Sequence, residues 1–260
     1  MAKDHFLPAA FLARFSGDRH TPVMRKRRIW VFRTSQGKAS FERAENVGTI
    51  NDMYRLQGEP WNAPALVDST WQGYEKRLTG ALNQLVDPHV GSVDAYLWLR
   101  VMVPFVAGLF VRGPDFTKRY EGQQAIIDIA RSREAEWQRD NTNASRLLAM
   151  RRILAPITAS KWIVEYSTGP EPMITNELGY VNSRHAPEPS GIGWAIPLGP
   201  AAILQILPCP EGYGRKILFD AGDGDWRAFI ERVTLRPGNH VSLNSSIAVG
   251  QARLCPFYHG

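Results

Sequence analysis

The hydrophobic pattern of this chain changes once, near residue 161, and that change constrains the fold most. Within residues 68–155 apolar side chains recur three or four positions apart, for example Trp71, Tyr74 and Leu78, which is the spacing of one helix face. Residues 161–220 instead hold short apolar runs separated by proline and glycine turns, which are typical of strands. A block of helices followed by a block of strands predicts an α+β fold.

A hairpin near the N-terminus completes the predicted sheet. Residues 29–32 indicate one strand, and residues 39–41 indicate its partner across a glycine-containing turn. We therefore expect the helical middle to pack on a mixed or antiparallel sheet built from this hairpin and the C-terminal strands. A last helix is expected over about residues 240–254, where apolar residues recur at helical spacing.

Length and composition indicate a globular protein. The 260 residues are 44% hydrophobic and 22% charged, and we expect a single domain over residues 1–260. Residues 101–111 are apolar throughout, but this run is too short to cross a bilayer and predicts a buried core helix with no membrane contact. The first residues lack the basic and apolar segments of a signal peptide, which favours a cytoplasmic location.

Residues 4–15 form the most distinctive stretch of the chain. Pro8 suits the first turn of a helix, because its missing N–H would have no partner there. The apolar face of this helix consists of Phe11, Leu12 and Phe15. His5 lies just before the helix and Arg14 in its last turn. Two interpretations of His5 are open: it caps or packs, or the helix holds His5 and Arg14 at the mouth of a pocket.

A basic segment without acids follows this helix. Residues 19–33 contain six lysines and arginines, and the whole chain has a net charge of +6. Two interpretations remain open: exposed charges that keep a strand from pairing with other chains, or a face that binds phosphates. The second predicts RNA or DNA as a partner, contacted through Arg14, Arg25, Lys26, Arg27 and Arg28.

The sequence offers no recognisable metal or cofactor site. Cys209 and Cys255 form no CxxC pair and are typical of cytosolic thiols, and no two histidines or cysteines have the spacing of zinc ligands. Asp220, Asp223 and Asp225 lie in a glycine-rich stretch without the alternation of a calcium loop, and we interpret them as turn residues. We therefore expect no metal and no cofactor.

Metal-independent RNA cleavage needs only a base, an acid and cations that stabilise the charge growing on the phosphate. The polar residues that fit these roles are His5, Tyr54, Glu75 and Arg112, and Thr175 and Asn176 are further pocket candidates. Glu75 lies beside the apolar face of its helix, where an unpaired acid would be costly. An ion pair with Arg112 or Arg14 is therefore the structural alternative for Glu75.

The motif His5-x-x-Pro8-x-x-x-Leu12-x-x-Phe15 resembles the opening of the bacterial domain of unknown function 4238 family. Weaker similarities to that family lie at residues 112–114, 197–200 and 243–244. Where the family tends to carry Thr-Ser-Asp-x-Pro, residues 175–179 are Thr-Asn-Glu-Leu-Gly, so the aspartate has moved or gone. The resemblance implies a bacterial or phage-borne cytosolic protein, and it implies no activity because the family has none assigned.

Two functions are compatible with these features. The first is a nucleic-acid-directed effector, such as a metal-independent ribonuclease-like toxin or defence protein. The second is a non-catalytic binding module for an anionic ligand or a partner protein. The two hypotheses differ over His5, Glu75 and Arg112, which an enzyme would bring together in a pocket open to solvent.

Overall fold

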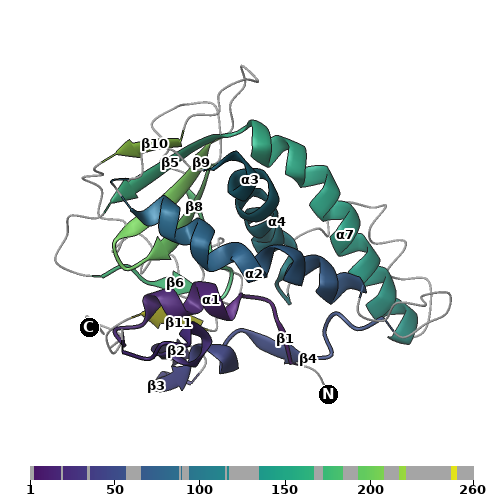
Figure 1. Cartoon of the computed structure of the whole chain (residues 1–260). Coiled ribbons are helices and arrows are strands. Elements are labelled where there is room, and N and C mark those ends of the chain that lie inside the picture. Colours follow the sequence, from purple (N-terminus) through teal and green to yellow (C-terminus); the bar gives the residue numbers. More distant parts are fainter. Residues whose placement is uncertain are drawn as a thin grey trace, which may run out of the picture.

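In the computed structural model, strands from both ends of the chain lie at the left and at the bottom of Figure 1, and helix α7 of the helical middle forms its right-hand side. The structure describes residues 3–18, 20–33, 36–56, 66–87, 89, 94–114, 116, 135–166, 172–183, 193–207, 217–220 and 247–250. Within these ranges the mixture of helices and mainly antiparallel strands confirms the predicted α+β class.

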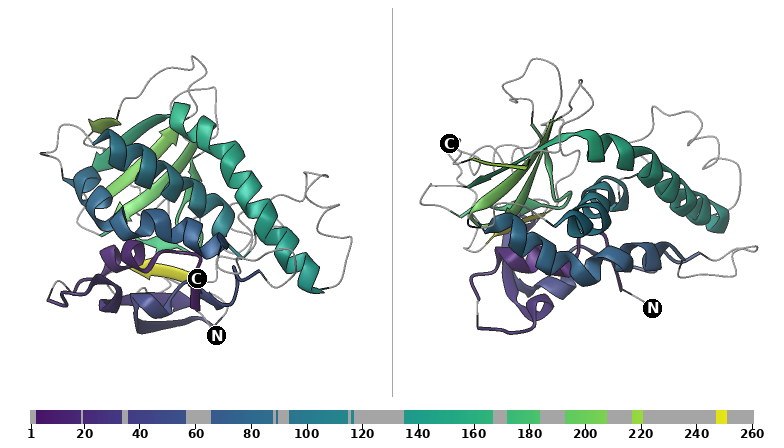
Figure 2. Two further views of the ribbon diagram at one scale, coloured as in Figure 1. Left: turned by 45° about the vertical axis from the view of Figure 1, so that its right-hand side comes forward. Right: turned by 45° about the horizontal axis from the view of Figure 1, so that its top comes forward.

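The first described helix is a single turn, and the later ones are mostly longer. The helices are α1 (Ala9–Leu12), α2 (Leu66–Val86), α3 (Ala95–Leu97), α4 (Val103–Arg112) and α7 (Ala135–Ala159), with 3₁₀ turns at Ala13–Phe15, Met24–Lys26 and Ala44–Asn46. A π-helical turn, Trp98–Met102, joins α3 to α4. Helix α2 contacts strands β5 and β8, and α4 packs against both α2 and α7 (Figure 2).

The strands form two larger sheets and one small ribbon. They are β1 (Lys3–His5), β2 (Arg28–Arg33), β3 (Lys38–Arg43), β4 (Thr49–Asn51), β5 (Lys161–Tyr166), β6 (Thr175–Asn176), β7 (Val181–Ser183), β8 (Gly193–Gly199), β9 (Ala202–Leu207), β10 (Ile217–Asp220) and β11 (Ile247–Gly250). One sheet has the order β10-β5-β9-β8-β7, the other β3-β2-β11-β6, and β1 pairs with β4 alone. The predicted hairpin, β2–β3, thus joins β11 and β6 in one sheet, of which β2, β3 and β11 lie below α1 in Figure 1.

The predicted C-terminal helix over residues 240–254 is wrong where the structure describes it. Ile247–Gly250 is a strand, β11, that pairs antiparallel with β2 on one side and β6 on the other. Pairing on both sides satisfies the backbone groups of β11, and this tertiary arrangement overrides the local helical spacing. The rest of that predicted helix lies outside the described residues.

The long apolar helix is buried as predicted, although its first part is rotated. In α4 every residue except Pro104 is buried. Tyr96 and Leu99 stand at helical spacing from the buried Val103 and Val106, yet they are 52% and 39% exposed, because the π-helical turn inserts a residue and shifts the face that follows. One described segment, Ala95–Arg112, is long and apolar enough to cross a membrane, and 67% of it is buried within the protein.

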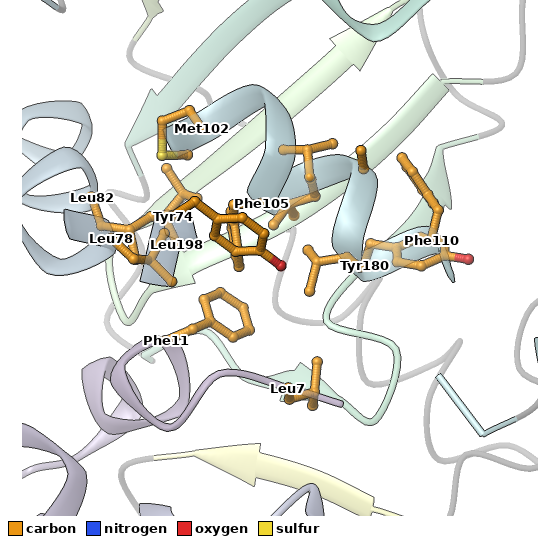
Figure 3. Packing of buried hydrophobic residues seen from close by; sticks show 14 of the residues in the cluster. Leu7, Phe11, Tyr74, Leu78, Leu82, Met102, Phe105, Phe110, Tyr180 and Leu198 are labelled. Carbon is orange, nitrogen blue, oxygen red and sulfur yellow. The ribbon is translucent and has the colours of Figure 1, made fainter. Parts of the chain in front are cut away.

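The opening helix is anchored in the same core. Phe11, Leu12 and Phe15 are 0% exposed, as the sequence predicts. The Phe11 ring lies 5.3 Å from the ring of Phe105 in α4 and faces the cluster that contains Tyr74 of α2 (Figure 3). Because this core fixes α1 against α2 and α4, it also fixes β1, which carries His5.

Candidate functional site

Arg112, at the end of α4, is the centre of the predicted catalytic set. Its Nη1 donates to the Glu75 carboxylate and, over 3.0 Å, to the Tyr74 hydroxyl. Its Nη2 donates to the backbone carbonyl of His5. The Arg112 side chain is 2% exposed and that of Glu75 26%. The structure therefore brings His5, Glu75 and Arg112 together, but only Glu75 and His5 reach solvent.

Tyr54 is joined to the same cluster from the other side. Its hydroxyl donates to the Arg112 carbonyl over 2.8 Å, and its backbone N–H donates to Asp4 Oδ2 over 2.9 Å. The residue is 0% exposed, and burial raises the pKa of its phenol. The buried phenol thus holds the end of α4 through the Arg112 carbonyl, and the backbone of Tyr54 holds Asp4.

The ion pair proposed as the structural alternative for Glu75 is present. Burial acts to lower the pKa of Arg112, but the surrounding Tyr74, Tyr54 and Glu75 outweigh it and raise that pKa. The Glu75 carboxylate compensates a charge that is costly to bury. Arg112 thus links its own helix, α4, to α2 and to β1 through hydrogen bonds.

A second buried arginine, Arg146 of α7, escaped the sequence analysis. Its Nη1 donates to the carbonyls of Val111 and Gly113, the latter over 2.9 Å. Its guanidinium carbon lies 5.8 Å from the centre of the Tyr54 ring. The available signal is its position four residues before the buried Met150, on one helix face.

His5 is the half-buried edge of this cluster. Its Nε2 lies 3.2 Å from the carbonyl oxygen of Glu45, which can only accept, so Nε2 carries a proton. Burial lowers the pKa of His5, although the Glu45 carbonyl and the nearby Glu75 act in the opposite direction. The imidazole is therefore neutral at pH 7, with Nδ1 as the nitrogen that can accept a proton.

Three of the five arginines and lysines predicted to bind nucleic acid are exposed, and Arg43 adds a fourth cation beside them. We call Arg25, Lys26, Arg28 and Arg43 the basic strip. Arg28 and Arg43 are register partners on β2 and β3. The Glu45 carboxylate lies between two members of the strip, 3.7 Å from Arg25 Nε and 3.8 Å from Arg43 Nη1.

The other two predicted contacts are directed inward. Arg14 donates from Nε to the Leu198 carbonyl over 2.7 Å and from Nη1 to Asn83 over 2.7 Å. Burial and then the charge of Arg27 lower the pKa of Arg14 to about 10, which leaves it protonated at neutral pH. Arg27 donates from Nε to the Thr21 carbonyl over 2.9 Å. Both therefore stabilise the chain around the strip.

Thr175 and Asn176, the further pocket candidates, are buried in β6. Asn176 Oδ1 accepts from the Leu178 N–H over 3.0 Å, and Nδ2 donates to the Tyr180 carbonyl over 3.2 Å. These bonds close a turn through Gly179, whose φ of +74° favours glycine. Thr175 Oγ1 is buried without a hydrogen-bond partner in the described part of the chain.

Among the described residues, no three histidine, cysteine, aspartate or glutamate side chains gather in a way that could hold a metal ion. Asp223, Asp225 and both cysteines lie outside the described residues.

The comparison with known proteins identifies a family. The family described as Protein of unknown function (DUF4238) matches residues 3–207, a span that contains the buried arginine cluster and the basic strip. No curated protein and no solved structure matches the chain. The family predicted from the sequence is thus confirmed, and the chain belongs to the DUF4238 family of proteins of unknown function.

Proposed function

We propose that the protein binds nucleic acid and contacts its sugar–phosphate backbone through the basic strip. The observation that carries the proposal is the direct opposition of Arg28 and Arg43 across β2 and β3. Like charges at paired positions of two strands repel each other and destabilise the sheet. An anion bound between them removes that repulsion, and a phosphate chain supplies such anions at regular intervals.

The alternative, that these charges only protect a strand edge, explains one residue of the strip. Strand β2 has β3 on one side along its whole length and β11 on the other side at residues 30–33, so the strand of Arg28 is an inner strand of its sheet. Arg25 and Lys26 precede β2 in a 3₁₀ turn and guard no strand edge. Within the described residues, Arg43 is the one member of the strip that lies on an edge strand. The net charge of +6 also favours a polyanionic partner.

The test is the salt dependence of binding to a labelled single-stranded oligoribonucleotide. In the variant Arg25→Ser/Lys26→Ser/Arg43→Ser, the slope of log K against log salt should become shallower by about 2, because each phosphate contact contributes about 0.7. The matched control replaces three exposed cations of α2 and α7, in Lys76→Ser/Arg151→Ser/Arg152→Ser. Its charge change is the same, and its slope should equal that of the wild type.

Two outcomes contradict the proposal. One is the absence of binding to either RNA or DNA at low salt. The other is an equal change of slope in the strip variant and the control, which would show attraction by net charge without a defined surface.

Metal-independent RNA cleavage is a second candidate function, and the position of His5 favours it. The neutral imidazole is hydrogen-bonded to the main chain of Glu45, whose carboxylate lies beside Arg25 and Arg43. RNA brings its own nucleophile. His5 Nδ1 would accept the proton of a 2′-hydroxyl as its oxygen bonds to phosphorus; the P–O5′ bond breaks, and water protonates the leaving 5′-oxygen. Arg112 and Tyr54 have no direct contact with substrate in this scheme.

Cleavage should survive EDTA and disappear in His5→Asn, whereas His20→Asn, at an exposed histidine, should cleave as the wild type does. RNA integrity in a bacterial host that expresses each variant gives the cellular counterpart relevant to a toxin or defence protein. Loss of cleavage on chelation, with recovery in magnesium, would overturn the metal-independent scheme.

A further inference from the structure

An aromatic pair lies beside the basic strip on the outward face of the hairpin. Trp30 of β2 and Phe41 of β3 are register partners, with ring centres 5.0 Å apart and an angle of 34° between the rings. Phe41 is 39% exposed. On the opposite face of β2, Ile29 and Val31 are 0% exposed and lie in the core. On the face of the aromatic pair, Trp30 is half-buried and Phe32, two residues further along β2, is 5% exposed, so this face is open to solvent at Trp30 and Phe41 and covered at Phe32.

Arg28 makes this pair a fixed platform. Its guanidinium carbon lies 4.8 Å from the centre of the Phe41 ring, and its Nη2 donates to the Phe41 carbonyl over 3.0 Å. On the other side of Trp30 the register partner is Gly250 of β11, which has no side chain to cover the indole. Aromatic rings and an arginine therefore share one surface at the end of the basic strip.

We infer that the ligand is single-stranded nucleic acid whose unpaired bases stack on Phe41 and Trp30. This inference rests on the proposed function. Bases in a duplex have their faces covered by neighbouring pairs, whereas an unpaired base offers its face to an exposed aromatic ring. Cations at the margin of the platform, Arg28 and Arg43, are placed for the phosphates that connect the stacked bases. A duplex would use the basic strip alone and leave the aromatic pair without a role.

The experiment compares a non-complementary oligoribonucleotide with a duplex of the same length. Phe41→Leu, a change at an exposed position of an edge strand, should weaken single-strand binding about tenfold and leave duplex binding unchanged. The control is Tyr96→Leu. Tyr96 is also an exposed aromatic under an arginine, with the Arg77 guanidinium carbon 5.0 Å from its ring centre, but it lies on α3. This control should change neither affinity, and a melting temperature recorded for each variant establishes that it is folded.

The outcomes separate this inference from the proposed function. Stacking is overturned if single strand and duplex bind with equal affinity and Phe41→Leu changes neither affinity. If the slope of log K against log salt is still shallower in the strip variant, binding of the sugar–phosphate backbone stands. An equal loss in Phe41→Leu and Tyr96→Leu also overturns stacking at this face. Absence of any binding overturns both.

Discussion

Arginines serve the molecule in two opposite ways, at the end of α4 and on the β2–β3 hairpin. Arg112 is 1% exposed and donates to three groups from two other elements, α2 and β1. The Arg25 and Arg43 side chains are 68% and 59% exposed, and their contacts to Glu45 are longer than a good ion pair. The comparison indicates that burial, and not residue type, decides which arginines hold the fold and which remain available to a ligand.

The energetic reason is the surroundings of each charge. A buried guanidinium loses its water and is tolerated only when hydrogen bonds and an acid replace it. An exposed guanidinium keeps its water, and its ion pairs are worth about 0–1 kcal/mol. Replacement should therefore affect stability at the first site and binding at the second.

The largest effect is expected at the buried site. Arg112→Met should lower the free energy of unfolding by about 3–5 kcal/mol, because the His5 carbonyl, the Tyr74 hydroxyl and the Glu75 carboxylate lose their donor. Urea denaturation measures this. Adding Glu75→Met should recover part of the loss, since an apolar pair replaces an ionic one. If Arg112→Met alone lowered the free energy of unfolding by less than about 1 kcal/mol, the buried arginine would contribute no more than an exposed one, which contradicts the proposed difference between the two regions.

A smaller, pH-dependent effect is expected at His5, between the two regions. Because burial lowers its pKa, the unfolded chain binds more protons than the folded one as the pH falls below about 6.5. Stability should therefore be fully present above that pH and decline on acidification. His5→Asn should cost about 1 kcal/mol or less at neutral pH and flatten this decline. Urea titrations on both sides of pH 6.5 decide the matter, and an unchanged decline in the variant would show that another group is responsible.

The smallest effect on stability is expected at the basic strip. Arg25→Ser/Lys26→Ser/Arg43→Ser should change the free energy of unfolding by no more than about 0.5 kcal/mol, because the side chains are exposed. Thermal unfolding checks this. Relief of the repulsion between Arg28 and Arg43 should raise the melting temperature slightly, within this limit. A large loss of stability would place the strip among the structural arginines.

The sequence predicted the helices and buried residues that have strong local patterns. It failed for elements whose conformation is decided by contacts with distant parts of the chain. The apolar face of α2 and the buried Phe11, Leu12 and Phe15 follow from periodicity alone. Asn141-Thr142-Asn143 has the composition of a helix break, but α7 continues through it, and Asn143 donates to the Met53 carbonyl over 3.1 Å. Strand β11 likewise depends on two partners far away in the chain.

The contacts of the candidate site also divide into those that the sequence could predict and those that depend on distant parts of the chain. The convergence of His5, Glu75 and Arg112 could be proposed from the sequence, because polar groups in apolar surroundings are costly unless they pair with one another. The inward direction of Arg14 was not, because its partners Leu198 and Asn83 are distant in sequence. The aromatic platform was also missed, because strand pairing alone puts Trp30 opposite Phe41, and only the folded structure leaves Phe41 39% exposed.

The most direct test is a paired measurement of RNA affinity and free energy of unfolding on two variants, at one low salt concentration and well below either melting temperature. The account predicts that Arg25→Ser/Lys26→Ser/Arg43→Ser keeps its stability and loses RNA affinity. Arg112→Met should lose stability and, while folded, bind RNA as the wild type does. The opposite pattern, with folded Arg112→Met unable to bind and the strip variant binding normally, would contradict the division between buried and exposed arginines.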